Sequence, residues 1–237
     1  MEPLVKIVHE DLDILVLDKP AGLVCHPTKG DEYSSLISRV RLYLKTSEDI
    51  HMVNRLDRET SGIVLVAKNI KSAVELRKIW ERRAVRKDYL AIVHGHMPDE
   101  HGVVDAPLGK DEQSRVAIKD CVRADGTPAQ TEFWVERRFL RQQSQFSLLR
   151  VFPHTGRKHQ IRIHLAHRGF PIVGDKLYGA DENLYLAFVK GRLTDEQRLQ
   201  LMVPYHALHA GELHFSWSRG ESVFRAEPES WFTDFHR

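Results

Sequence analysis

Apolar and polar positions recur along the chain with two spacings, one typical of strands and one typical of helices. Short apolar or alternating runs between turn residues predict strands at residues 4–8, 14–18, 63–67, 88–94, 130–140, 145–152 and 207–217. Apolar residues three and four positions apart predict helices at 34–44, 70–86, 155–169 and 195–202, and a short amphipathic piece at 229–237. Ser34 or Ser35 and then Asn69 are the expected caps of the first two helices.

The chain shows no internal repeat, low-complexity segment or flexible linker, and its 237 residues suffice for a substantial core. Residues 95–130 are rich in Gly, Pro and charged residues, so irregular structure with at most a hairpin is expected there, and a turn is expected at Asp125-Gly126. We therefore expect one continuous domain over residues 1–237.

The composition mainly excludes classes of protein. Hydrophobic content of 42% and charged content of 29% are typical of a soluble globular protein. No apolar run reaches the ~18 residues of a membrane span, and the N-terminus lacks the build of a signal peptide. The only cysteines, Cys25 and Cys121, lie far apart, which suits a reducing compartment, although one bridge between them is possible. We expect a cytoplasmic protein without a membrane partner.

The net charge of +2 conceals two basic segments. Residues 70–87 hold seven Lys or Arg against two acids, and residues 137–168 hold eight Lys or Arg, four His and no acid. Concentrated positive charge of this kind predicts a face that meets phosphate backbones. A merely solvated helix face is the alternative, and the absence of acids makes it weaker for residues 137–168.

Asp57 is the candidate reactive group. It lies between Arg55 and Arg58, where the apolar run at residues 50–56 breaks into a loop that ends in Thr60-Ser61-Gly62. Nearby cations favour the ionised carboxylate, which can act as a nucleophile, a base or a stabiliser of charge. The local pattern alone also fits a hairpin-turn Asp in a surface ion pair.

Two further positions carry candidate chemistry. Tyr89 opens a predicted strand directly after basic residues, so it could stack on a nucleobase, act as a base, or simply be half-buried. Arg162 lies beside an apolar helix stripe, where an Arg usually has a carboxylate partner. Lys19, at the start of an early loop, could bind phosphate or serve only the loop.

Several chemistries lack their sequence signals. The pairs His164/His167 and His94/His96, the latter with Asp99 nearby, are weak metal signals without further ligands at a recognisable spacing. No glycine-rich phosphate loop follows a strand, and no Gly-x-Ser-x-Gly occurs, which disfavours nucleotide cofactors and serine hydrolases of that type. The remaining pattern suits cofactor-free chemistry on a nucleic acid.

Seven segments, in order along the chain, resemble the motifs of the RluA-type pseudouridine synthases. They are Leu17 to Gly22, Arg55 to Gly62, Lys87-Asp88-Tyr89, Thr127 to Thr131, Thr155 to His164, Gly174 to Gly179, and Leu208-His209-Ala210. One departure is Asn54, where the family usually has His, and we expect it to affect only local hydrogen bonding. The separate S4-like RNA-binding domain of many relatives looks absent.

The resemblance implies an α+β catalytic domain with a long, bent, mainly antiparallel mixed sheet flanked by helices. It implies that uridine in RNA is isomerised to pseudouridine after base flipping, without cofactor or metal. The partner would be a stem-loop of ribosomal or transfer RNA, read by a monomer. A catalytically idle RNA-binding or chaperone-like module on the same fold is the alternative, and intact Asp57, Tyr89 and Arg162 favour the enzyme.

The resemblance also implies a role for individual residues. Asp57 would be the essential carboxylate, and Arg162 would pair with it and hold it ionised. Tyr89 would stack on the uracil and take up a ribose proton, while Leu208 would line the pocket. Arg55 would fill the space that the flipped base leaves. The implied RNA-binding residues are Arg55, Arg58, Lys87, Arg157, Lys158 and His159.

Overall fold

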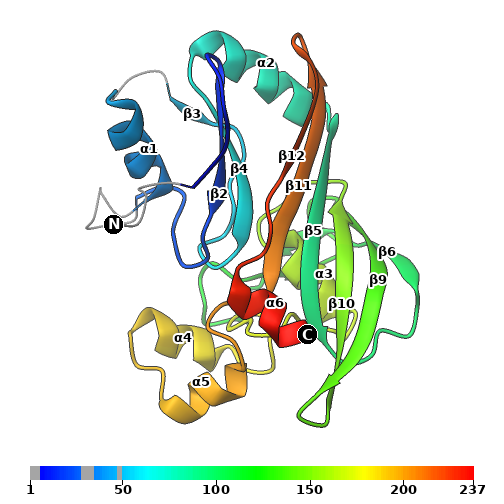
Figure 1. Ribbon diagram of the computed structural model, residues 1–237. Helices are drawn as coiled ribbons and strands as arrows, with labels where there is room; N and C mark the ends of the chain where they lie inside the picture. Colours follow the sequence, from blue (N-terminus) through cyan, green and yellow to red (C-terminus); the bar gives the residue numbers. More distant parts are fainter. Residues whose placement is uncertain (1–5, 28–34, 47–49) are drawn as a thin grey trace. The chain divides into compact units, whose positions relative to one another are not determined.

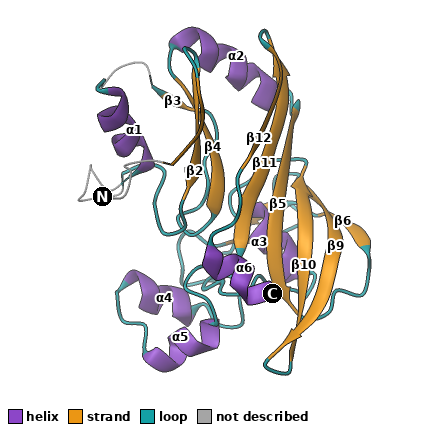
Figure 2. Ribbon diagram, viewed as in Figure 1, coloured by secondary structure: helices purple, strands orange, loops and turns teal. Residues whose placement is uncertain are grey.

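The computed structural model of the chain describes residues 6–27, 35–46 and 50–237 (Figure 1). The chain forms two compact units. Unit 1 comprises residues 1–87 and 209–229, and unit 2 comprises residues 88–208 and 230–237. Both contain strands and helices (Figure 2), in agreement with the predicted α+β class. The prediction of one catalytic domain over residues 1–237 remains a prediction.

The sheet of unit 1 has the strand order β1-β2-β4-β11, with β3 paired to β4 and β12 paired to β11. Only the β4–β11 pair is parallel, and the others are antiparallel. The strands are β1 (Lys6–Glu10), β2 (Ile14–Lys19), β3 (His51–Met52), β4 (Ser61–Ala67), β11 (Leu208–Trp217) and β12 (Gly220–Arg225). Strand β12 was not predicted, and β3 is shorter than the apolar run that contains it.

Helices cover both faces of β2 and β4, which explains why these strands are continuous apolar runs rather than alternating ones. Leu15, Leu17, Val64 and Val66 pack with α1 (Leu36–Leu44). Their neighbours Ile14, Val16, Ile63 and Leu65 pack with α2 (Ile70–Glu81). Each strand therefore supplies alternate side chains to two cores, and every residue of β4 is buried.

The predicted helix caps of unit 1 are confirmed, but one helix end is wrong. Ser35 caps α1, and the Asn69 side chain accepts from the backbone N–H of Ser72 at the start of α2. Ser34 lies outside the described residues. Helix α2 ends at Glu81 instead of residue 86, because Arg83 takes a left-handed backbone (φ 57°) and β5 already begins at Val85.

The sheet of unit 2 has the strand order β5-β10-β9-β6, and all its pairs are antiparallel. The predicted pair at 130–152 is confirmed as β9 (Gln130–Arg141) and β10 (Ser144–Pro153). The other strands are β5 (Val85–His94) and β6 (His101–Asp105), and a separate hairpin joins β7 (Leu108–Lys110) to β8 (Asp120–Val122). The region expected to be irregular thus contains three short strands, and the turn at Asp125-Gly126 closes with a bond from the Gly126 N–H to the Arg123 carbonyl.

Four helices belong to unit 2: α3 (Gln160–His167), α4 (Asn183–Val189), α5 (Asp195–Leu201) and α6 (Ser230–His236). Helix α4 was not predicted. The predicted start of α3 at Thr155 is wrong, because the Thr155 hydroxyl instead bonds the Gln160 side chain and the Gln130 N–H. His159 then takes a left-handed backbone (φ 55°) immediately before the helix. The predicted end of the helix at Gly169 is confirmed to within two residues, because α3 ends at His167 and Gly169 has φ 84°.

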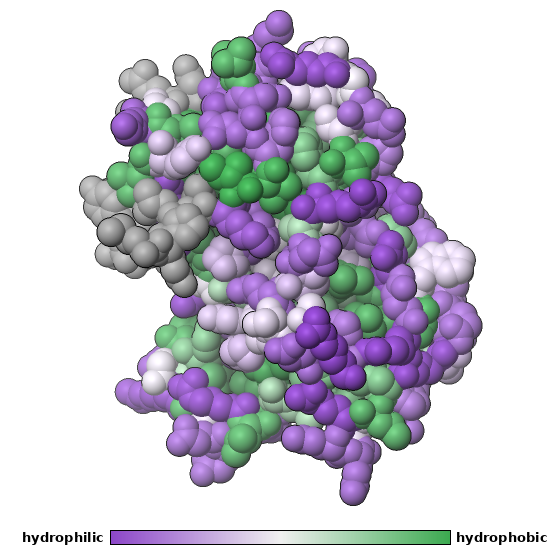
Figure 3. Space-filling view, in the orientation of Figure 1, coloured by the Kyte–Doolittle hydropathy of each residue, from purple (hydrophilic) through white to green (hydrophobic). Residues whose placement is uncertain are grey.

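On the face shown in Figure 3, hydrophilic side chains predominate, with smaller apolar areas among them, as is normal for a water-exposed surface. Among the described residues, none of the helices has the length and hydropathy needed to cross a bilayer. Cys25 and Cys121 are both free thiols.

Gly62 at the second position of β4 provides a test of how closely β4 and β11 approach. Its φ is +109°, and a Cβ there would overlap the backbone of Ala210, its partner in β11. We expect Gly62→Ala to lower the free energy of unfolding by at least about 3 kcal/mol, because backbone strain and overpacking add. Urea denaturation measures this loss.

Gly220→Ala is the matched control in the same unit. Gly220 has a similar φ of +102°, but nothing lies within 4 Å of a Cβ added there. It should cost only the strain of the left-handed backbone, about 1–2 kcal/mol. Equal losses in the two variants would show that the approach of Ala210 contributes nothing.

Candidate functional site

Asp57 lies in the loop between β3 and β4, where the sequence predicted a strand to break into a turn. The Thr60 N–H donates to the Asp57 carbonyl (3.2 Å), and this turn leads directly into buried β4. The Asp57 side chain is half-buried, whereas Arg55 and Arg58 are exposed. The loop thus presents a carboxylate between two cations that solvent can reach.

Lys19 at the end of β2 binds the backbone of this loop. Its side chain is completely buried, and its Nζ donates to the carbonyls of Pro20 (2.9 Å), Leu23 (2.8 Å) and Arg58 (3.1 Å). Two further bonds join the same segments, from the Gly22 N–H to the Arg58 carbonyl (2.9 Å) and from Arg58 Nε to the Gly22 carbonyl (3.1 Å). Of the two roles left open for Lys19, the structure supports the one in the loop.

The charge of Lys19 also matters to Asp57. Burial lowers the pKa of Lys19 to about 8, against the opposing attraction of Cys25, Asp57, Glu229 and Asp18. Because the attraction between Lys19 and Asp57 is mutual, the ammonium group favours the charged form of the carboxylate. Sequence analysis missed this partner, because Lys19 and Asp57 are far apart along the chain.

Asn54 and Cys25 form hydrogen bonds at the N-terminal end of the Asp57 loop. Asn54 Nδ2 donates to the Ile63 carbonyl (3.1 Å), and Asn54 Oδ1 accepts from the Leu65 N–H (2.7 Å). The Cys25 thiol lies 3.4 Å from both the N–H and the carbonyl oxygen of Leu56, and burial raises its pKa. The two bonds of Asn54 tie the loop to β4.

Ser61 and His209 join the start of β4 to β11. Ser61 Oγ lies 2.9 Å from His209 Nδ1, and His209 Nε2 lies 2.9 Å from the Ala226 carbonyl. Burial lowers the pKa of His209, so the neutral ring donates through Nε2 and accepts the Ser61 hydroxyl at Nδ1. The side chain after Leu208 is therefore structural.

In unit 2, Tyr89 and Leu208 belong to one apolar cluster. Leu208 is buried (4% exposed), and half-buried Tyr89 packs against the cluster that contains it. Tyr89 is the fifth residue of β5 and pairs in register with Val151 of β10. The structure thus brings the predicted stacking residue and the predicted pocket residue to the same part of unit 2.

Arg162 on α3 is buried and forms a two-pronged ion pair with Asp175. Its Nε donates to Asp175 Oδ2 (2.7 Å) and its Nη2 to Oδ1 (2.9 Å), while the guanidinium carbon lies 5.0 Å from the centre of the Tyr178 ring. Oδ1 also accepts the N–H groups of Leu177 (2.9 Å) and Tyr178 (3.0 Å). Although burial raises the pKa of Asp175, Arg162 outweighs it and holds that pKa far below its usual range.

The expectation of a carboxylate partner for Arg162 is therefore confirmed, and Asp175 is one such partner. Sequence analysis did not single out Asp175; the available signal was an acid directly after Gly174 in a turn-rich loop, within one of the resembling segments. The pair of Arg162 with Asp57 links a residue of unit 2 to one of unit 1, and it stays a prediction.

The predicted RNA-binding residues of unit 2 directly precede the first residue of α3. Arg157 and Lys158 are exposed; Arg157 Nε donates to the Pro128 carbonyl (3.1 Å), and Lys158 pairs with Asp120 (2.9 Å). His159 Nδ1 lies 2.8 Å from the Tyr178 hydroxyl. Lys87, in unit 1, is only partly exposed, and burial lowers its pKa to about 8.

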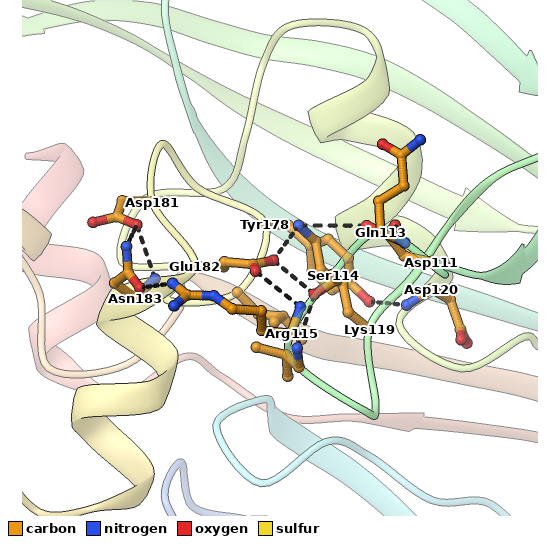
Figure 4. A network of polar contacts seen from close by, with 12 residues as sticks. Asp111, Gln113, Ser114, Arg115, Lys119, Asp120, Tyr178, Asp181, Glu182 and Asn183 are labelled. Atoms are coloured by element: carbon orange, nitrogen blue, oxygen red, sulfur yellow. Dashed lines mark hydrogen bonds and ion pairs between the residues drawn. The ribbon is translucent and has the colours of Figure 1, made fainter.

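A network centred on Glu182 fixes the loop that follows β7 (Figure 4). The Glu182 carboxylate accepts from the Ser114 hydroxyl (2.7 Å), the Lys119 ammonium (2.8 Å) and the Arg115 N–H (3.3 Å). The bond from Lys119 is the largest of the effects that lower the pKa of Glu182 to about 2. The Asp120 N–H donates to the Tyr178 hydroxyl (3.2 Å), so the partner of Lys158 is held in place.

Two of the residues that gave weak metal signals, His164 and Asp99, are engaged in other contacts. Burial lowers the pKa of His164, whose Nε2 donates to the Ala106 carbonyl (2.9 Å) while Nδ1 lies 2.8 Å from the Thr131 hydroxyl. Asp99 pairs with Arg168 (2.7 Å). Within residues 6–27, 35–46 and 50–237, no three His, Cys, Asp or Glu side chains are grouped to hold a metal ion.

Comparison with solved structures supports the predicted fold. The human RNA pseudouridylate synthase domain containing 1 superposes with a TM-score of 0.76 at 24% identity, covering 96% of this chain and 86% of that one. The human RNA pseudouridylate synthase domain containing 4 gives 0.73 at 25% identity, with 96% and 90% covered. The predicted pseudouridine synthase fold is thereby confirmed.

Sequence relatives carry the same family name. An uncharacterized RNA pseudouridine synthase from Aquifex aeolicus is 36% identical over 85% of this chain, and one from Bacillus subtilis is 35% identical over 92%. This chain spans only 64% and 66% of their lengths. The dual-specificity RNA pseudouridine synthase RluA from Vibrio parahaemolyticus is 36% identical over 90% of this chain and 78% of its own length.

The model of the RNA pseudouridylate synthase family matches residues 13–167, a span that contains the Asp57 loop, Tyr89 and Arg162. The relatives that are 35–36% identical over most of this chain agree with this match. The chain therefore belongs to the RNA pseudouridylate synthase family, a family of isomerases.

Proposed function

We propose that this chain isomerises uridine to pseudouridine in structured RNA, with Asp57 as the essential carboxylate. The observation that supports this most directly is the Asp57 loop. Its carboxylate is half-exposed between two exposed arginines, while Lys19, Asn54 and Cys25 fix the backbone on either side. A module that only bound RNA would gain nothing from a carboxylate facing a polyanion.

The proposed reaction rearranges bonds without changing composition. The bond between the ribose C1′ and N1 of uracil breaks, the base rotates, and a bond from C1′ to C5 forms. The proton on C5 is lost, and N1 of the attached base gains a proton. Neither an oxidant nor an energy source enters this balance, and we therefore propose catalysis by side chains alone.

The roles of the other residues follow the resemblance. We propose that the target base is flipped out, at a cost of a few kcal/mol, and that Arg55 fills its place. Tyr89 stacks on the uracil, takes up a ribose proton and returns it to the ribose once the bond from C1′ to C5 has formed. Leu208 lines the pocket, and Arg162 supports the ionised Asp57. Asp175 keeps the Arg162 guanidinium in one orientation through its two bonds.

The proposed partner is a stem-loop of ribosomal or transfer RNA. Relatives named ribosomal large subunit pseudouridine synthase C and D, and the dual-specificity RluA, support this class of substrate. Exposed Arg55, Arg58, Arg157 and Lys158 are suited to phosphate contacts, with Lys87 and His159 beside them. We propose that the chain acts as a monomer in the cytoplasm.

Asp57→Asn tests the central role. It removes the charge without changing size, so we expect tritium release from RNA labelled at C5 of uridine to fall at least about a hundredfold. RNA affinity should stay within a few-fold, because binding depends on the cations. Asp125→Asn, in an exposed turn of unit 2, is the control and should keep full activity. Undiminished release by Asp57→Asn would refute the role of Asp57.

Arg162→Lys tests the buried guanidinium. Lysine keeps the charge but cannot make the two parallel bonds to Asp175, so single-turnover tritium release should fall at least about tenfold. Arg168→Lys is the matched control, since exposed Arg168 directly follows the same helix and also pairs with a carboxylate, Asp99. Thermal melts monitored by circular dichroism must show both variants folded. Equal rates in the two variants would mean that the geometry of Arg162 is not special.

A further inference from the structure

The two basic segments of the sequence differ in a way that composition conceals. In residues 137–168, which contain no acid, carboxylates from elsewhere neutralise five of the cations. Arg138 pairs with Glu100, Arg150 with Asp88 and Glu136, Lys158 with Asp120, Arg162 with Asp175, and Arg168 with Asp99. The absence of acids within this segment therefore overstates the positive charge that it leaves unneutralised.

Helix α2 is the opposite case. Lys71, Arg77, Lys78, Arg82 and Arg83 are all exposed, and no carboxylate of the described residues forms an ion pair with any of them. The helix has two acids of its own. Glu75 is engaged with the N–H (2.6 Å) and hydroxyl (2.8 Å) of Ser218, and Glu81 forms no pair with these cations.

Three of these cations lie in a line. Lys71 and Lys78 on α2 are seven positions apart, and Arg82, the residue that caps the C-terminus of α2, follows four positions later, which places the three on one stripe about 16 Å long. The buried face, with Ala73 and Leu76, points away from this stripe into the core of unit 1. The α2 stripe, as we call Lys71, Lys78 and Arg82, is thus rigidly mounted and free to meet a polyanion.

We propose that the α2 stripe is a docking surface for the phosphate backbone of the substrate RNA, outside the residues assigned to the reaction. The proposal rests on the proposed function for the identity of its partner. Phosphates complement an unpaired row of cations, and contacts with them position an RNA without reading its sequence. An anionic lipid surface fits less well, because the apolar face of α2 is buried and only Ile70 and Val74 remain exposed beside the stripe.

Charge reversal tests the stripe. The variant K71E/K78E/R82E is compared with K190E/R192E/R198E, which changes the net charge equally at exposed unit 2 cations that likewise form no ion pair within the described chain. The probes are deproteinised ribosomal and transfer RNA, bound on filters at several salt concentrations. For the stripe variant, we expect Kd and KM to rise at least about tenfold. The slope of log Kd against log salt concentration should fall by the equivalent of roughly two phosphate contacts or more.

The outcomes separate this proposal from the proposed function. If the wild-type chain neither binds nor modifies these RNAs, the proposed function fails. If it does both and the two triple variants lose equal affinity, bulk charge explains the effect and the stripe is not a docking surface. Unchanged RNA affinity together with lost binding to phosphatidylserine vesicles would assign the stripe to a lipid surface and overturn the proposal.

A second, independent observation concerns Asn54. Strand β3 pairs with β4 through His51 and Met52, and the Val53 N–H continues the ladder to the Leu65 carbonyl (2.8 Å). At Asn54 the side-chain amide takes over, donating to Ile63 and accepting from Leu65. These partners, one carbonyl and one N–H, also fix which amide atom is oxygen and which is nitrogen.

We infer that Asn54 is a positioning residue for Asp57. Its amide supplies the donor and acceptor of a missing backbone peptide, so the chain can leave the sheet without leaving buried groups of β4 unpaired. The backbone of residues 55–58 is then free to turn outward at a fixed point. This inference also rests on the proposed function for its effect on activity, but not for its effect on the Leu65 amide.

Asn54→Asp and Asn54→Ala give different pH signatures if this is right. The carboxylate of Asn54→Asp would face the Ile63 carbonyl, which raises its pKa, and only its protonated form can donate there. Its activity relative to wild type should therefore rise as pH falls toward 5. Asn54→Ala should be reduced at every pH, at least about tenfold in kcat with little change in KM.

Hydrogen exchange of the Leu65 amide provides a readout that does not depend on activity. Exchange should accelerate in Asn54→Ala, which lacks an acceptor, and less so in Asn54→Asp, which retains one. Wild-type protection of Leu65 in both variants would overturn the inference even if the wild-type chain is active. An inactive wild-type chain with the expected exchange pattern would instead count against the proposed function alone.

Discussion

The arrangement around Asp57 depends on one buried ammonium group. Lys19 lies with its side chain fully buried at the end of β2, and an unpaired charge at such a depth would cost several kcal/mol. The carbonyls of Pro20, Leu23 and Arg58 offset part of that cost by accepting hydrogen bonds from its three N–H groups. Those carbonyls come from two loops, so satisfying the charge necessarily fixes one loop against the other.

Side chains repeatedly take the place of backbone partners near Asp57. Asn54 completes the edge of β4, and the neutral ring of His209 links Ser61 to Ala226. Gly62 allows β11 to approach where no other residue would fit. A loop held in these ways loses little further entropy when a substrate binds, which is the physical advantage of placing a reactive carboxylate there.

The sequence predicted those features that depend on local pattern. The runs in β2 and β4, the Asn69 cap, the β9–β10 pair and the breaks around Asp57 could all be found, because periodicity and turn chemistry are local properties. Helix ends were harder to predict from the sequence. Arg83 and His159 adopt left-handed backbones without being Gly or Asn, so nothing in the local sequence marked the end of α2 or the start of α3.

The partners of charged groups were the hardest to predict, because they depend on the fold and not on the neighbouring sequence. Arg162 meets Asp175 only after a helix and a turn have folded together, and Lys19 meets Arg58 across a β-strand pair. The same reasoning inverts the ranking of the basic segments. A stretch without acids lies beside acids from other parts of the fold, whereas α2 contains two acids that neutralise none of its cations. Free positive charge, which is what a polyanion senses, is therefore a property of the folded surface and cannot be counted along the chain.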